Sequence, residues 1–240
     1  MSTLKVLSAG AVKRGVAQIA AAHEQSVGAK VEVEFTQVPK MKKRIAAGEC
    51  ADVLVATAGA MDEFAAAGKI VPATRALLGR SRVGVVVHRD APAIDVSDTE
   101  AFKRALLAAN AVVHNDASSG VYIAVLLEKL GLKALLGDRV VVVNSGAAII
   151  TTVAERGPGA GGTNGAIGAI GMGQISEIMV MIDKGCAVKL AAPLPDAIQN
   201  VSTYYAAVMA ASAMPDAAAA LTRELTSDAA KTIFAATGID

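Results

Sequence analysis

Arg82-Val-Gly-Val-Val-Val-His88, which runs on into Arg-Asp-Ala-Pro92, is a long apolar stretch that predicts a strand crossing from one lobe of the protein into a second. Before it, the chain alternates short apolar strands with helical patterns. Strands are expected over 5–10, 31–35 and 52–56, and each is followed by a helix. This alternation predicts βαβ units, a parallel sheet and helices on both of its faces.

After the crossing, further strands and helices form the second lobe, until a strand over Val188–Ala192 and the following Pro193-Leu-Pro lead out of it. Ala-rich helices then return to the first lobe, over 203–214, 216–226 and 227–236. We therefore expect an α/β protein of two α/β lobes joined by two hinge strands, with a ligand cleft between the lobes. Lobe one comprises 1–84 plus 194–240, and lobe two comprises 85–193.

Composition narrows the possible partners. The 240 residues carry a net charge of +1 without a basic tract, so a nucleic acid is not expected as a partner. Cys50 and Cys186 match no metal spacing and are expected as buried free thiols, and three scattered histidines predict no metal site. No stretch is long and apolar enough for membrane insertion.

The start of the chain bears on localisation. Met1-Ser-Thr-Leu-Lys5 leads directly into a strand, without the basic and apolar regions of a signal peptide. The sequence as written predicts a cytoplasmic protein. A periplasmic location is expected instead if a signal peptide has been removed from the natural protein.

Four stretches resemble the molybdate-binding-protein family, which has the type II periplasmic-binding-protein fold. The resemblance implies two hinged lobes that capture a small anion, and an ABC transporter as partner if the protein is exported. The stretches are Val6-Leu-Ser-Ala-Gly-Ala-Val-Lys13, Gly48-Glu-Cys-Ala-Asp-Val-Leu-Val55, Leu127-Glu-Lys-Leu-Gly-Leu132 and Ala192-Pro-Leu-Pro-Asp-Ala-Ile-Gln-Asn200.

The chain departs from this family where the ligand is held. The resemblance implies two side-chain hydroxyls in lobe one, but this chain has Ala11 at the first position and Val38 at or near the second. A tyrosine expected within 171–174 is also missing. Because a compact dianion needs several convergent donors, the ligand is expected to be an organic di- or tricarboxylate rather than molybdate. A branch of the family that resembles aconitate isomerase, an enzyme without a cofactor, fits these departures better.

In open parallel sheets, ligands bind outside the carboxyl ends of the strands. In lobe one, three loops occupy such positions, and the first leads into a helix whose free N–H groups can hold an anion, although a plain tight turn would look the same. Arg14 could add positive charge to this site, or Arg14 and Lys13 could simply be two solvated surface charges. The candidate contacts are Ser8, Gly10, Ala11, Val12, Arg14, Val38 and Thr57.

In lobe two, Asn115-Asp-Ala-Ser-Ser-Gly-Val-Tyr122 follows a strand and opens a helix. One serine caps the helix, and the other could meet an anion together with the N–H groups of Gly120 and Val121. The candidate ligand contacts are Ser118, Ser119, Gly120, Val121 and Gln174. His114 and Tyr122 are candidate catalytic residues only if the protein is an isomerase, since a lone histidine on a buried strand is more often a core residue.

Two functions therefore remain open. The first is a solute-binding protein that captures a small anionic ligand by hinge closure. The alternative is a cofactor-free isomerase of an unsaturated polycarboxylate, which also needs a base near the carbon acid. The residues supply candidate cations for this chemistry but do not identify the base.

Overall fold

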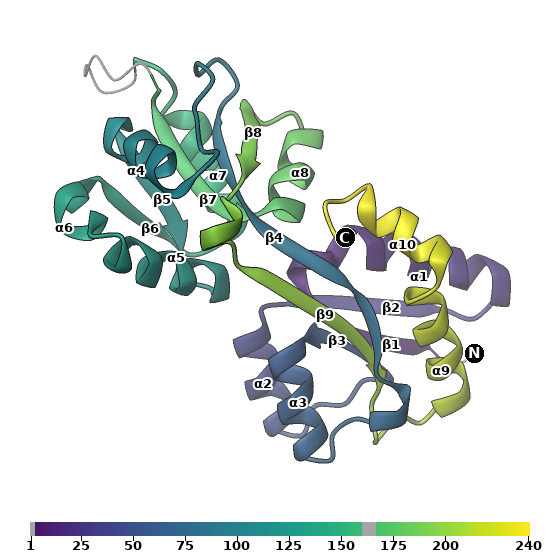
Figure 1. The fold of residues 1–240 in the computed structure, drawn as a ribbon. Helices are drawn as coiled ribbons and strands as arrows, with labels where there is room; N and C mark the ends of the chain where they lie inside the picture. The colour runs from purple at the N-terminus through teal and green to yellow at the C-terminus, as the bar shows by residue number, and fades with distance from the viewer. Residues whose placement is uncertain (1–2, 160–166) are drawn as a thin grey trace. The chain divides into compact units, whose positions relative to one another are not determined.

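The computed structural model describes residues 3–159 and 167–240 and divides into two compact units. Unit 1 comprises residues 1–81 and 202–240, and unit 2 comprises 82–201. Both units are mixed α/β, which confirms the predicted fold class (Figure 1). The chain passes from one unit to the other within β4 (Ala76–His88) and at the start of β9 (Val201–Val208).

Unit 1 is built on three parallel strands followed by an antiparallel one. Strand order is β2-β1-β3-β9, and the first residues of β4 continue it. The central strand β1 is buried at every position except Lys5, whereas β2 at the edge alternates between more and less exposed residues. The strands are β1 (Leu4–Ala9), β2 (Val31–Thr36) and β3 (Val53–Thr57).

Helices cover both faces of the unit 1 sheet (Figure 1). Helices α1, α9 and α10 pack with one another over a core that contains Val16, Leu221 and Phe234. Helices α2 and α3 cover the other face, where Met41 and Met61 are fully buried. The bounds are α1 (Lys13–Val27), α2 (Val38–Ala46), α3 (Ala58–Ala66), α9 (Pro215–Leu225) and α10 (Asp228–Ala235).

Unit 2 has the strand order β4-β7-β5-β6, with β8 paired to β4. Strands β5, β6 and β7 are parallel, whereas β4 runs antiparallel to β7 and β8. The sheet is therefore mixed, because the strands on which the chain enters and leaves are antiparallel to their neighbours. The bounds are β5 (Ala111–Asn115), β6 (Val140–Val143), β7 (Ala169–Gln174) and β8 (Val188–Pro193).

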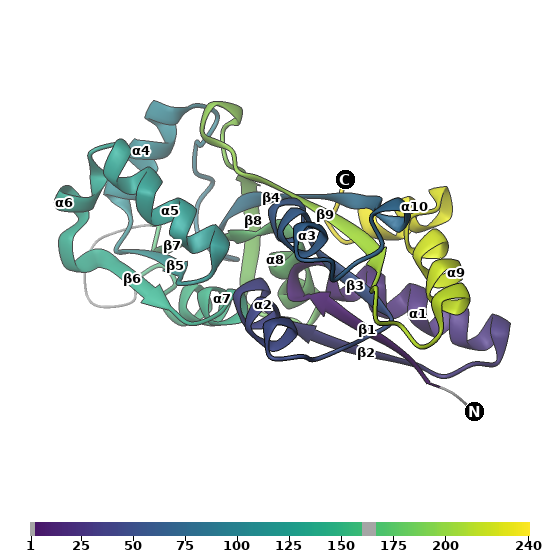
Figure 2. The ribbon, with the colours of Figure 1, turned by 90° about the horizontal axis from the view of Figure 1, so that it is seen from below.

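The helices of unit 2 also form two layers (Figures 1 and 2). Helices α4, α5 and α6 cover the core around Phe102, Ile123 and Leu132, and helices α7 and α8 cover the core around Ile149 and Ile178. The bounds are α4 (Thr99–Ala108), α5 (Ser118–Lys129), α6 (Leu132–Leu136), α7 (Gly146–Glu155) and α8 (Ile175–Asp183).

Two predictions are corrected by the structure. The helix expected over 203–214 is wrong, because this segment forms most of β9 and pairs with β3 from Val53↔Val208 to Thr57↔Tyr204. Its β-branched and aromatic residues fit a pleated surface, and this outweighs the helix propensity of its alanines. The thiol of Cys50 is exposed rather than buried, because it lies in the turn before β3, whereas Cys186 is partly buried.

Candidate functional site

In unit 1, three loops lie next to one another at the carboxyl edge of the sheet. Strands β1, β2 and β3 are parallel, and Ala9 and Thr36 are register partners at the ends of β1 and β2. Because parallel neighbours end at the same edge, the loops after the three strands are adjacent. The candidate residues of unit 1 therefore lie within one region of that unit.

The helices that start at this edge share a second property. Helices α1, α2 and α3, and the short 3₁₀ turn Gly10–Val12 before α1, have no side chain that caps their first N–H groups. In contrast, α4 is capped by Asp98 and α10 by Ser227. An uncapped helix start leaves backbone donors available and favours negative charge. This edge can therefore bind an anion through the backbone.

The side chains of the first loop contribute little to such binding. The Ser8 hydroxyl is fully buried and donates to the carbonyl oxygen of Ala9 at 3.2 Å, and Val12 is buried in the core. Gly10 is open, since a Cβ added there would meet no atom within 4 Å. Arg14 is exposed and has an interaction partner in the structure. In this loop, the backbone is better placed than the side chains to contact a ligand.

The second and third loops present apolar and hydroxyl groups. Val38 of the second loop, like Ala11 of the first, is partly buried, packs against the unit 1 core and carries no hydroxyl. Thr57 precedes the first residue of α3 without capping it. The Lys13 ammonium lies 5.4 Å from the ring centroid of Phe35, which is within the range of a cation–π contact.

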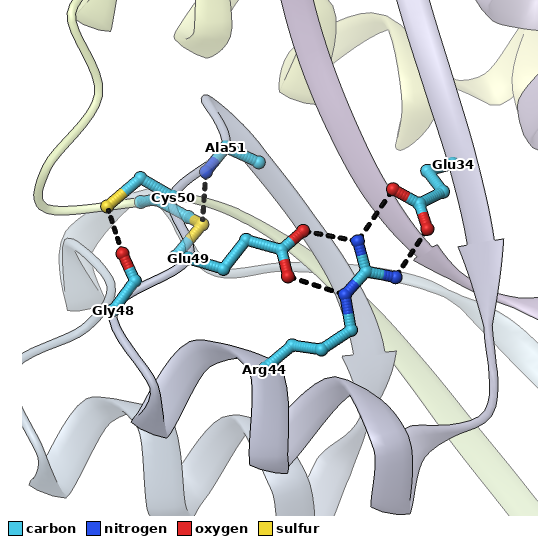
Figure 3. Close-up of polar contacts among 7 residues, drawn as sticks. Glu34, Arg44, Gly48, Glu49, Cys50 and Ala51 are labelled. Carbon is cyan, nitrogen blue, oxygen red and sulfur yellow. Dashed lines mark hydrogen bonds and ion pairs between the residues drawn. The ribbon is translucent and has the colours of Figure 1, made fainter.

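An ion-pair network holds the second loop's helix against the sheet (Figure 3). Arg44 of α2 donates to both carboxylate oxygens of Glu34 on β2 and to both of Glu49 in the turn before β3. These hydrogen bonds lower the pKa of Glu34 and raise that of Arg44. The doubly bidentate geometry links β2, α2 and the start of β3, and so fixes the loops between them.

In unit 2, His114 and Asn115 end β5 at the corresponding edge. His114 is buried, and its Nδ1 lies 2.8 Å from the carbonyl oxygen of Asn115. A carbonyl only accepts, so Nδ1 carries the proton in this contact. The Asn115 Oδ1 accepts from the N–H groups of Ala117 and Gly120 at 3.2 and 3.1 Å.

This local network changes the expected role of the helix start. The N–H of Gly120 donates to Asn115, and the N–H of Val121 donates to the carbonyl oxygen of Ala117. Both groups therefore have partners within the chain, contrary to the expectation that they are free for an anion. The N–H groups of Ser118 and Ser119 come before these two at the start of α5, which has no side-chain cap. Ser119 itself is buried.

The other predicted residues of unit 2 lie on two elements. The Tyr122 hydroxyl donates to the carbonyl oxygen of Ile198 at 2.8 Å, and burial raises the pKa of this tyrosine. Gln174 ends β7, is buried and has an interaction partner in the structure. Because β7 and β5 are adjacent and parallel, Gln174 lies at the same edge as Asn115.

Sequence reasoning missed the helix that begins at this edge directly after Gln174. Ser176 and Glu177 lie in the first turn of α8. The Ser176 hydroxyl is buried and has no hydrogen-bond partner among the described residues. Glu177 is partly buried, and burial raises the pKa of its carboxyl. The apolar spacing of Ile175, Ile178 and Ile182 was the signal for this helix.

Two kinds of feature are absent from the described part of the chain, a cluster of metal-binding side chains and a membrane-spanning helix. Across residues 3–159 and 167–240, His, Cys, Asp and Glu side chains form no group of three that could hold a metal ion. None of the helices described is long and apolar enough to cross a membrane.

Comparisons with known proteins identify a family, a relative and solved structures of the same fold. The model of the bacterial extracellular solute-binding proteins matches residues 4–240. An aconitate isomerase from Pseudomonas sp. is 30% identical over 97% of this chain and 86% of its own length. The periplasmic molybdate-binding protein of Azotobacter vinelandii superposes with a TM-score of 0.73 at 17% identity, covering 99% and 98% of the two chains. The sulfate-binding protein of Mycobacterium tuberculosis gives 0.72 at 16% identity, with 100% and 86% covered.

Proposed function

The chain belongs to the bacterial extracellular solute-binding protein family, and from this premise we propose that it binds a small unsaturated polycarboxylate and moves its C=C bond. The ligand class is supported by the carboxyl edge of unit 1, where three helix starts lack a side-chain cap and Ala11 and Val38 replace hydroxyls. Backbone donors suit carboxylate groups, and the apolar residues suit a short carbon skeleton. This uncapped edge is the observation that carries the proposal.

The reaction is supported by the aconitate isomerase, whose likeness extends over nearly the whole of this chain. Aconitate is a tricarboxylate with one C=C bond next to a CH2 group. Such a ligand offers carboxylates to several helix starts, and its isomerisation needs only proton transfer. We therefore propose trans- and cis-aconitate as the first substrates to test.

The test is to incubate the purified protein with trans-aconitate and to follow cis-aconitate by chromatography. Turnover that is abolished by heat denaturation supports the proposal. Saturable binding without turnover supports the second candidate function, a solute-binding protein that captures an organic anion. If the protein is exported, it would deliver this anion to an ABC transporter. That candidate is favoured by the family itself. Neither binding nor turnover of any di- or tricarboxylate would refute both.

A further inference from the structure

Glu177 is a carboxyl group placed at the carboxyl edge of the unit 2 sheet. It lies in the first turn of α8, directly after β7, and its carboxyl packs against Gly146, the first residue of α7. Helix α7 follows β6, and β6 and β7 are both parallel to β5. The Glu177 carboxyl is therefore held between two helix starts at the edge where open parallel sheets bind ligands.

The approach of Glu177 depends on the missing side chain at Gly146. A Cβ built on Gly146 would lie 1.9 Å from Glu177 Oε2 and 2.6 Å from its Cδ. No carbon and oxygen atoms can be so close without a bond, so glycine is required for this position of the carboxyl. The backbone of Gly146 does not have a positive φ, so its conformation does not require glycine. The close contact with Glu177 is the reason why this position has no side chain.

The surroundings of Glu177 are unusual for a carboxyl group. Burial is the sole cause of its raised pKa, and no hydrogen bond or ion pair from a described residue counteracts it. The preceding hydroxyl of Ser176, only 3% exposed, also has no partner among the described residues. A buried polar group without a partner is costly to stability, so the Ser176 hydroxyl is in place for something other than packing, and the partly buried carboxyl of Glu177 follows it directly in the first turn of α8.

A purely structural role in the helix does not require this arrangement. Glu100 occupies the first turn of α4, where it complements the helix dipole while exposed and paired with Lys103 at 3.0 Å. Glu177 complements the dipole of α8 in the same way, but its carboxyl is partly buried and no described residue supplies a cation to it. A carboxyl with a raised pKa instead holds a proton more readily than an ordinary carboxyl, which suits it to take up and return one.

We propose that Glu177 is the catalytic residue that transfers a proton between the two ends of the allylic unit of the ligand. This inference rests on the proposed isomerase function. The Glu177 carboxylate removes a proton from the CH2 carbon, and the electron pair of that C–H bond forms the new C=C bond. The electrons of the old C=C bond take the proton back from Glu177 at the former CH carbon. Atoms, charge and oxidation states balance without a co-reactant.

The two other candidates are less suited to this step. His114 is buried in β5, with its Nδ1–H directed to Asn115, and Tyr122 donates its hydroxyl proton to Ile198. Burial also raises the pKa of Tyr122, so less of this tyrosine is in the phenolate form that could act as a base. Glu177 differs from both, because no described residue occupies the oxygens of its carboxyl, and burial raises the pKa of that carboxyl.

The test compares wild type, Glu177→Gln and the control Glu100→Gln, with aconitate as the probe. Substituting one general acid–base group costs about 10²–10⁴-fold. We therefore expect Glu177→Gln to lower kcat at least about 100-fold with KM within about threefold, and Glu100→Gln to leave both unchanged. In deuterium oxide, wild type should introduce deuterium at the CH2 carbon, as seen by NMR, whereas Glu177→Gln should not.

The possible failures are distinguishable. A wild type that binds aconitate without turnover or deuterium exchange overturns both the proposed function and the role of Glu177. An active wild type with a Glu177→Gln variant that stays within about threefold in kcat overturns only the role of Glu177. If Glu177→Gln fails to fold by circular dichroism, Glu177→Asp serves in its place. That variant keeps the carboxyl but withdraws it by one methylene, and an unchanged kcat would overturn the role equally.

Discussion

Gly146→Ala tests the geometry of Glu177 without altering Glu177 itself. The added methyl carbon would lie 1.9 Å from Oε2, and Cβ contacts below 3.0 Å essentially do not occur. The carboxyl must therefore retreat by about 1.1 Å. It can do so easily, since it is the end of a flexible side chain. Gly146 is the first residue of α7 and its φ is not positive, so alanine fits the backbone there and the variant should fold.

The expected effect is on turnover rather than on binding. A misplacement of about 1 Å can cost on the order of 10²-fold in rate, so kcat for aconitate should fall about 100-fold while KM changes little. In a Glu177→Gln background the same substitution should have no further effect, because the group that it displaces is already inactive. NMR of the cis and trans isomers measures all four proteins. Equal losses from Gly146→Ala in both backgrounds would refute the reasoning.

Three further predictions follow from single contacts. Gly15→Ala places a Cβ 2.3 Å from the buried ring of Phe234 and should lower the free energy of unfolding by about 1–3 kcal/mol. Gly59→Ala, which has open space around the added Cβ, should not lower it, and urea titrations of the two variants measure the difference. The raised pKa of Glu177 means that its stabilising protonated form is lost as pH rises, so Glu177→Gln should melt higher than wild type at pH 8 and equally at pH 4 in thermal scans. Molybdate should bind weakly by calorimetry, because Ala11 and Val38 each lack a donor worth about 1 kcal/mol, and nanomolar affinity would contradict this.

The fold class and the family could be predicted because both depend on local patterns. Strands such as β1 and β5 are short apolar runs bounded by small or polar residues, and most helices have amphipathic spacing. Strand β9 could not be predicted in this way. Its Ala206 and Ala207 favour a helix in isolation, and only the pairing with Val55 and Leu54 of β3 makes this segment a strand.

The candidate site could likewise be predicted only where it depends on local sequence. Uncapped helix starts follow from residues that are adjacent in sequence, so the loops around Gly10 and Ser118 could be selected as candidates. The partners of the Gly120 and Val121 N–H groups depend on the exact turn that Asn115 forms, which the sequence leaves open. Glu177 is harder still, since its burial depends on α7, and the residue that admits its carboxyl, Gly146, is distant in the sequence.

The position of Glu177 also bears on the choice between capture and catalysis. A protein that only captures an anion is better served by donors and cations at its strand ends, since a carboxylate there repels the ligand. Glu177 lies at such an edge, against the start of α7, and no described side chain neutralises it. Its cost is removed when it holds a proton, and a proton that can be held and returned is what the shift of a C=C bond requires. A carboxyl without a partner among the described residues, placed beside a helix start, is thus a disadvantage to a protein that only binds an anion. It is an advantage to an isomerase.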